Sequence, residues 1–202
     1  MIRPFGDAAL LVELESAERA QSLAASLRKD PAPGMVEAVP GLASVLVEFD
    51  PLRADERALS VALEARLDAI PSTTPGGRLH TIPVVYDGPD MDDVAASTGL
   101  SRASVVAAHT EVELRVRFCG FAPGFAYLGD VPERLRVGRL ATPRTATPAG
   151  SVAIAGRMSA IYPALLPGGW PVIGNADVDL FDPTAEAPSL LVPGDRVRFV
   201  PA

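Results

Sequence analysis

The stretch from Gly120 to Asp182 constrains the fold more than any other part of the sequence, because little of it can be helical. Prolines occupy positions 123, 132, 143, 148, 163, 167 and 171, and glycines occupy positions 120, 124, 129, 138, 150, 156, 168, 169 and 174. Proline removes a backbone donor and fixes φ, whereas glycine admits positive φ and close backbone approach. We therefore expect turns and short strands here. Loops of this kind on a rigid sheet often carry binding residues, although barrel turns also need these residues for geometry alone.

Residues 1–75 carry the pattern of a small α+β domain. Strand patterns cover Ile2–Pro4, Ala8–Leu14, Met35–Val39 and Ser44–Phe49, and helix patterns cover Ala17–Lys29 and Asp55–Ile70. The order ββαββα predicts helices on one face of an antiparallel sheet. A run rich in proline, glycine, serine and threonine at residues 71–77 then predicts a linker.

Residues 78–202 carry the pattern of a mainly β domain. A strand restarts over Leu79–Tyr86, two short helices cover Asp90–Thr98 and Arg102–Thr110, and strand patterns recur at Glu113–Phe118 and Arg196–Val200. Many short strands with turn signals predict a closed barrel. The predicted fold class is thus an α+β N-terminal domain followed by a mainly β barrel.

Composition excludes several chemistries. The formal net charge of −7 disfavours nucleic-acid and anionic-membrane partners, which require a basic face. The only lysine, Lys29, is followed by Asp30, so the sequence holds neither a Walker A loop nor a lysine for covalent biotin. One cysteine and two histidines cannot build a structural zinc site or an HExxH helix, so we expect no metal site. No GxSxG elbow and no GxGxxG loop is present.

The first residues, MIRPFGDAALL, interrupt any apolar run with Asp7. This pattern is neither that of a signal peptide nor that of a membrane span. We therefore expect a cytoplasmic location.

Two cationic side chains are candidates for chemistry, and each has a structural alternative. His109 ends a predicted helix, where the helix dipole favours an imidazolium that could hold an anion or transfer a proton; alternatively it is a structural histidine under the barrel. Arg144 lies between Thr142 and Thr145 in a turn that suits a carboxylate or phosphoryl group. Its alternative is an ion pair at the barrel rim. His80 is interpreted as structural.

Hydroxyl and aromatic residues complete the candidate set. Ser151 follows Ala149-Gly150 without an adjacent base, so it is assigned to binding and not to nucleophilic attack. Tyr127 and Tyr162 can wall a pocket or fill the barrel, whereas Trp170 is assigned to the core. The predicted substrate-binding residues are Gly120, Phe121, Pro123, Gly124, Tyr127, Thr142, Thr145, Ser151 and Tyr162.

Long motifs carry a resemblance to a known family. They are GFAPGFAYLG (Gly120–Gly129), ATPRTATPAGSVAIAG (Ala141–Gly156), IYPALLPGGW (Ile161–Trp170) and LFDP (Leu180–Pro183), with IRPFGDAALLVEL at the start and PGDRVRFVP at the end. These motifs resemble the family that contains the B subunit of 5-oxoprolinase, the first allophanate-hydrolase-type subunit of urea amidolyase, and the Kip-type inhibitor of a sporulation histidine kinase. Ala122, Ala126 and Asp130 depart from the family pattern, as does the run Arg157–Ala160.

The resemblance implies a cyclophilin-like barrel over residues 78–202 and a subunit that is silent alone. One implied function is a heteromeric, ATP-dependent 5-oxoprolinase in which a larger partner subunit shares the ATP contacts. A second is a carboxyltransferase subunit of a urea-amidolyase-like system, with biotin carried on another polypeptide. A third is a non-catalytic inhibitor of a sensor kinase. Both enzymatic alternatives act on a small carboxylate or amide substrate and place an anionic carboxyl or carboxyphosphate-like species near Arg144, and His109 matches a histidine of the family motif.

Overall fold

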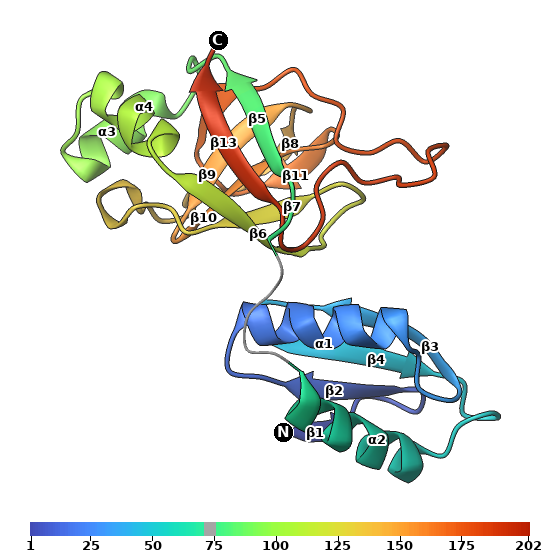
Figure 1. Cartoon of the computed structure of the whole chain (residues 1–202). Helices are drawn as coiled ribbons and strands as arrows, with labels where there is room; N and C mark the ends of the chain where they lie inside the picture. Colours follow the sequence, from blue (N-terminus) through green and yellow to red (C-terminus); the bar gives the residue numbers. More distant parts are fainter. Residues whose placement is uncertain (71–75) are drawn as a thin grey trace. The chain divides into compact units, whose positions relative to one another are not determined.

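The computed structural model describes residues 1–70 and 76–202, and divides the chain into two compact units, Met1–Gly76 and Gly77–Ala202 (Figure 1). Residues 71–75 of the predicted linker lie outside the described residues. Within the described part the chain is mostly β, with four α-helices and one large sheet that nearly closes into a barrel. None of the described helices is both long and apolar enough to span a bilayer.

The unit Met1–Gly76 is a four-stranded antiparallel sheet with two helices. In the order β1-β2-β4-β3, the strands are β1 (Ile2–Pro4), β2 (Ala9–Glu13), β4 (Ser44–Phe49) and β3 (Met35–Pro40), and the helices are α1 (Ala17–Lys29) and α2 (Glu56–Ala69). The Ser16 hydroxyl accepts the Arg19 backbone N–H at 3.3 Å and so caps α1, as its residue type predicts. One apolar cluster joins Leu10 and Val47 of the sheet to Leu23 of α1 and Leu63 of α2.

The unit Gly77–Ala202 is built on a seven-stranded sheet. Its order is β12-β9-β10-β7-β6-β13-β5, from strands β12 (Val172–Asn175), β9 (Ser151–Ala155), β10 (Met158–Ile161), β7 (Ala126–Gly129), β6 (Glu113–Cys119), β13 (Arg196–Pro201) and β5 (Leu79–Val84). A bridge between Val85 and Asn175 joins the two edges, so the sheet nearly closes. Within this described sheet, only β13 and β5 pair in parallel. Accessory elements are α3 (Met91–Thr98), α4 (Arg102–Thr110), the 3₁₀ turn η1 (Glu133–Leu135) and a separate two-stranded antiparallel sheet of β8 (Arg144–Thr147) with β11 (Leu166–Gly168).

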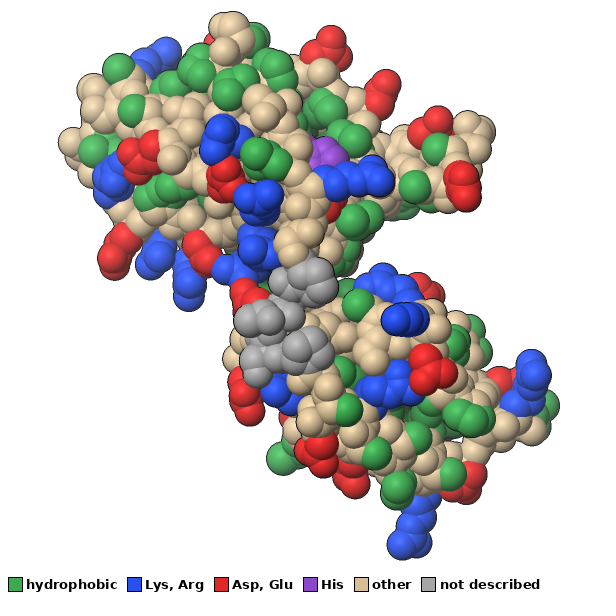
Figure 2. Space-filling view, viewed as in Figure 1, with side chains coloured by type: hydrophobic (Ala, Val, Ile, Leu, Met, Phe, Trp, Pro, Cys, Tyr) green, Lys and Arg blue, Asp and Glu red, His purple; other side chains and the backbone are tan. Residues whose placement is uncertain are grey.

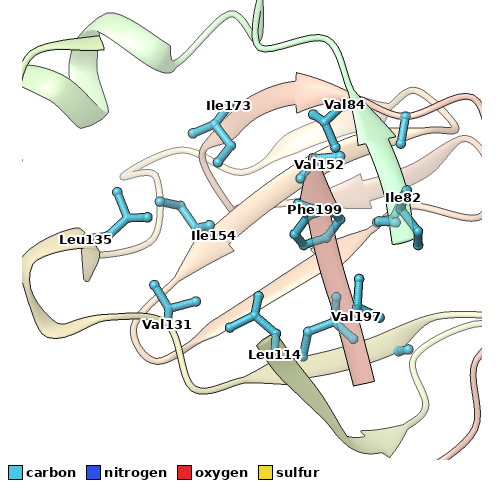
Figure 3. Packing of buried hydrophobic residues seen from close by; sticks show 14 of the residues in the cluster. Ile82, Val84, Leu114, Val131, Leu135, Val152, Ile154, Ile173, Val197 and Phe199 are labelled. Carbon is cyan, nitrogen blue, oxygen red and sulfur yellow. The ribbon is translucent and has the colours of Figure 1, made fainter. Parts of the chain in front are cut away.

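The barrel core consists of side chains that point inward from strands distant in the sequence. Figure 3 shows Phe199 among Ile82, Val152 and Ile154, and all four are buried. Burying each such side chain stabilises the fold by about 1.5–3 kcal/mol. The alternation predicted over Glu113–Phe118 is present, with Leu114 and Val116 fully buried. The core therefore holds the turns of the Gly/Pro-rich stretch in fixed positions.

Charged side chains of both signs are interspersed on the visible face of each unit (Figure 2). On the outer face of the barrel, Glu113 accepts hydrogen bonds from Arg196, at 2.9 Å, and from Arg198. Ion pairs this exposed contribute about 0–1 kcal/mol each. The surface around Glu113 is therefore solvated and carries charges of both signs.

Candidate functional site

A cavity of about 160 Å³, the aromatic pocket, lies among the turns of the Gly/Pro-rich stretch. Its lining is Phe121, Phe125, Tyr127, Arg139, Tyr162, Pro167, Gly168, Gly169 and Trp170. The β6–β7 hairpin supplies the first three, and the segments around β11 supply the last four. The backbone N–H of Leu140 donates to the Gly169 oxygen at 2.7 Å and so holds the Arg139 segment beside the cavity.

Phe125 is the centre of the pocket's aromatic wall. Its ring meets those of Tyr127, Tyr162 and Trp170 edge to face, with centroids 5.0, 5.4 and 6.3 Å away. Such pairs add about 0.5–1.5 kcal/mol each beyond the area they bury. Together with neighbouring apolar residues they form a cluster separate from the barrel core. The wall is therefore rigid, and presents aromatic faces and edges to a ligand.

Phe121 stands at the rim of this pocket in a strained conformation. Its φ is 73°, in the left-handed region, and its side chain is 58% exposed. A bulky residue with positive φ is an outlier that costs roughly 1–3 kcal/mol. Its ring lies edge to face with Phe125, with a centroid distance of 5.2 Å. Strain of this kind concentrates at functional sites, and here it exposes an aromatic ring at the pocket mouth.

The polar groups of the aromatic pocket are two phenols and a guanidinium. Burial raises the pKa of Tyr127 and of Tyr162, and the charge of Arg139 partly opposes both shifts. Both phenols are therefore neutral near pH 7 and can donate hydrogen bonds. Arg139 is exposed, and within residues 1–70 and 76–202 no carboxylate pairs with it. It is thus available to a ligand anion.

A second cavity, of about 190 Å³, is named the Arg144 pocket. It is lined by Asp87, Gly88, Pro89, Arg144, Thr147, Pro148, Ser151, Val172, Gly174 and Asn175. The Arg144 Nη2 atom donates to Asp90 Oδ1 at 2.6 Å, and Asp90 Oδ2 accepts the Val172 backbone N–H at 2.7 Å. Arg144 therefore forms an ion pair with Asp90, which is the kind of contact that the structural alternative for this residue expects. Direct contact of Arg144 with substrate stays a prediction.

Tyr162 lines the aromatic pocket and interacts with a residue of the Arg144 pocket. Its hydroxyl faces Gly168, where an added Cβ would lie only 2.1 Å from that oxygen. A hydrogen bond from Thr147, which lines the Arg144 pocket, acts to lower the pKa of the Tyr162 phenol against the larger effect of burial. Gly168, which lines the aromatic pocket, pairs with Arg144, which lines the other pocket, in the antiparallel β8–β11 sheet, so this strand pair contributes to both cavities.

His109 lines neither pocket. It is fully buried, and its ring stacks on Phe199 with centroids 4.5 Å apart. Its Nε2 lies 3.0 Å from Ser159 Oγ, which itself donates to the Ala153 oxygen, so Nε2 carries the proton. Its Nδ1 then accepts from the Tyr86 hydroxyl at 2.8 Å. Burial lowers the pKa of His109 to about 3, so the ring is neutral. A catalytic role for it stays a prediction, and the geometry is that of a structural histidine.

The other predicted residues divide between the pockets and the turns. Phe121, Tyr127 and Tyr162 line the aromatic pocket, and Ser151 lines the Arg144 pocket. Gly120, Pro123, Gly124, Thr142 and Thr145 line neither. Gly124 has a φ of 78° and lies so close to Phe181 that an added Cβ would be 2.8 Å from that side chain, so its part is to shape the turn.

Sequence reasoning did not select Phe125, Arg139 or Gly168 for the site, and it assigned Trp170 to the core. Trp170 is 8% exposed, and it both joins the aromatic cluster and lines the pocket. Phe125 and Trp170 stand inside the motifs GFAPGF and PGGW, which are a usable signal. Arg139 stands outside every motif, and only the fold places it beside the tyrosines.

The comparisons with known proteins agree with the motifs. The family model described as carboxyltransferase domain, subdomain C and D, matches residues 1–191. The chain is 44% identical to the 5-oxoprolinase B subunit of Escherichia coli O157:H7, over 97% of this chain and 93% of that protein. It is 35% identical to the 5-oxoprolinase B subunit of Bacillus subtilis, over 98% of this chain and 91% of that protein.

A solved structure extends the likeness to the fold. The crystal structure of TTHA0988 superposes with a TM-score of 0.86 at 38% identity and covers 96% of this chain. This chain spans 40% of the length of TTHA0988. Because the family model matches nearly the whole chain and the relatives are similar over nearly their full length, the chain belongs to the family described as carboxyltransferase domain, subdomain C and D.

Proposed function

We propose that this chain is one subunit of an ATP-dependent 5-oxoprolinase, which converts 5-oxoproline to glutamate together with a larger partner subunit. The observation that carries the proposal is the similarity, over more than nine-tenths of both chains, to the 5-oxoprolinase B subunit of Escherichia coli. The name of that relative implies at least one other subunit. The sequence has no Walker A loop, so the proposal includes ATP contacts shared with the partner.

The chemistry of the aromatic pocket supports this substrate class. 5-Oxoproline is a small lactam ring that carries one carboxylate. In the proposal the ring lies against Phe125 and Trp170, and the carboxylate pairs with Arg139, which no described carboxylate neutralises. A guanidinium forms bidentate, charge-assisted hydrogen bonds with a carboxylate.

The two phenols of the pocket supply the remaining contacts. Because burial keeps Tyr127 and Tyr162 protonated near neutral pH, each can donate to the lactam carbonyl oxygen. A neutral hydrogen bond of this kind contributes about 0.5–1.5 kcal/mol net. The work proposed for this chain is to bind and orient the lactam while ATP activates it. A separate subunit then completes ring opening.

A second candidate function is a carboxyltransferase subunit of a urea-amidolyase-like system. The observation that favours it is the family's own description, which names a carboxyltransferase domain. In this alternative a carboxyl group arrives on biotin carried by another polypeptide, and Arg139 would hold that carboxyl group. The substrate would then be urea or a related amide in place of 5-oxoproline.

The experiment that tests the proposal is reconstitution of the chain with the partner subunits from the same organism. We expect ATP hydrolysis that depends on 5-oxoproline, glutamate as product, and no turnover by the isolated chain. Arg139→Ala should raise KM for 5-oxoproline by roughly tenfold or more, because a charge-assisted pair contributes about 1.5–3 kcal/mol.

The matched control is Arg134→Ala, which removes an arginine that is also exposed and lies outside both pockets. A complex that ignores 5-oxoproline and carboxylates urea would support the second function instead. A complex that turns over neither substrate, while the chain inhibits a sensor kinase, would contradict both.

A further inference from the structure

The segment Phe181–Leu190, called the arm, extends away from the barrel (Figure 1). The barrel core anchors both of its ends, because the flanking residues Leu180 and Leu191 are buried there. Between these anchors residues 181–188 are all exposed. Side chains this exposed add little to the stability of a fold. The stability of the barrel therefore does not account for the arm.

The arm has a fixed backbone although its side chains lie in solvent. Phe181 forms an antiparallel bridge with Ser189, and the Asp182 backbone N–H donates to the Pro188 oxygen at 2.8 Å. Near the tip, the Thr184 hydroxyl donates to Asp182 Oδ1 at 2.7 Å. A segment that is ordered before it meets a partner loses less conformational entropy on binding. The arm is therefore preorganised for contact with another molecule.

Exposed apolar side chains gather at the base of the arm. Phe181, Leu190 and Val192 are all exposed, although each is large and apolar. The turn that carries the exposed Phe121 lies against Phe181, since an added Cβ at Gly124 would be only 2.8 Å from the Phe181 Cβ. Large apolar side chains exposed next to one another are typical of protein–protein interaction sites. Because Phe121 also lines the aromatic pocket, this surface adjoins the pocket mouth.

The charge of the arm and its flanks is negative only. Positions 158–195 contain no lysine or arginine, whereas Asp177, Asp179, Asp182 and Glu186 are exposed there and pair with no described cation. In Figure 2 the outer part of the arm shows carboxylates and no cation. Such a surface repels nucleic acid and anionic membranes, and the net charge of −7 opposes association with a second copy. Charge complementarity therefore favours a protein partner with a basic surface.

We propose that the arm, with the apolar side chains at its base, is the docking surface for the partner subunit. The partner presents basic side chains to the carboxylates and an apolar recess to Phe181. This inference rests on the proposed function, because it takes the occupant to be the larger subunit of that complex. TTHA0988, of which this chain spans 40%, contains further polypeptide in addition to this fold, which agrees with a surface that other polypeptide covers.

The test is the affinity of the full chain for the purified partner subunit from the same organism, measured by biolayer interferometry at low and at physiological salt. Glu186→Lys should weaken binding by roughly three- to tenfold, mainly through slower association, and should reduce its salt dependence, because a charge at the edge of an interface acts on the association rate. Phe181→Ala should weaken binding by roughly tenfold or more, mainly through faster dissociation, because truncation of an interface aromatic removes much of the binding energy.

Asp93→Lys is the matched control and should leave the affinity and the association rate unchanged. Asp93 is also an exposed carboxylate of this unit, but it lies on α3, on the opposite side of the barrel from the arm (Figure 1). The urea midpoint from Trp170 fluorescence checks that each variant is folded. Glu186→Lys changes only an exposed side chain, so it keeps the test decisive even if Phe181→Ala unfolds.

Weaker binding by the folded arm variants, with Asp93→Lys unchanged, supports docking on the arm. If the wild-type chain forms no complex with the partner subunit, the proposed function fails and the docking surface fails with it. If the wild-type complex forms and the folded arm variants bind as tightly, the docking surface is overturned while the proposed function stands. Self-association of the chain that depends on the arm, in place of partner binding, would assign the arm to a second copy and overturn the proposal as well.

Discussion

Replacing Arg144 by alanine should destabilise the barrel unit by about 2–3 kcal/mol, because it leaves a nearly buried carboxylate without its cation. Asp90 is 5% exposed, and after the substitution only the Val172 backbone N–H, among the described groups, still donates to its carboxylate. Removal of one partner from a buried ion pair costs about 3–5 kcal/mol. The Arg144 side chain is 30% exposed, so solvent screens part of this loss. We therefore expect about 2–3 kcal/mol, below the range for a fully buried pair.

The assay is urea denaturation followed by tryptophan fluorescence. Trp170 is the only tryptophan in the sequence, so the signal reports on the unit Gly77–Ala202. Arg144→Lys is expected to retain the charge pair, and should lose only about 1 kcal/mol for the hydrogen-bond geometry that an ammonium cannot reproduce.

The matched control is Arg157→Ala. Arg157 also pairs with an aspartate, Asp130, at 3.0 Å, but the two side chains are 65% and 42% exposed. Its removal should change the unfolding free energy by less than about 0.5 kcal/mol. If Arg144→Ala were no more destabilising than Arg157→Ala, the Asp90 ion pair would not be a structural anchor of the barrel.

Three further predictions concern single positions. Burial lowers the pKa of His109 to about 3 in the folded state, whereas the same imidazole in the unfolded chain has a pKa near 6.5. The unfolded chain therefore takes up a proton on His109 first, and the free energy of unfolding should fall as the pH drops from about 6.5 toward 3. His109→Gln should flatten this pH dependence. Gly168→Ala should cost roughly 1–3 kcal/mol because its Cβ would collide with the Tyr162 hydroxyl, whereas Gly138→Ala, which has open space around it, should be tolerated; equal midpoints in urea would contradict this. Phe121→Gly should stabilise the fold by roughly 1 kcal/mol, because glycine adopts a positive φ without strain. The same substitution should weaken binding of 5-oxoproline by the reconstituted complex. A loss of stability would instead show that the exposed Phe121 ring stabilises the β6–β7 hairpin.

Local features of the fold were readable from the sequence because their causes are local. Ser16 caps the helix that follows it, as its residue type predicts. The alternation of Glu113–Phe118 buries Leu114 and Val116, whereas Phe118, which lies beyond a shift in strand register, is only partly buried. The glycine and proline positions predicted turns and short strands between Gly120 and Asp182. Long motifs in the same stretch identified the family, since a motif requires only consecutive residues.

The site itself depended on contacts between residues far apart in the chain. Within its own turn Arg144 has the pattern of a free cation, yet it pairs with Asp90, 54 positions away. His109 ends a helix, where charge would be favoured, but the closing of the barrel buries it against Phe199 and makes it neutral. No sequence motif marks Arg139. In the folded chain the segment before β8 packs against Gly169, and this contact places Arg139 in the lining of the aromatic pocket. Sequence patterns specify which residues turn, alternate or cap, whereas the charge and availability of a side chain depend on what the tertiary fold places beside it.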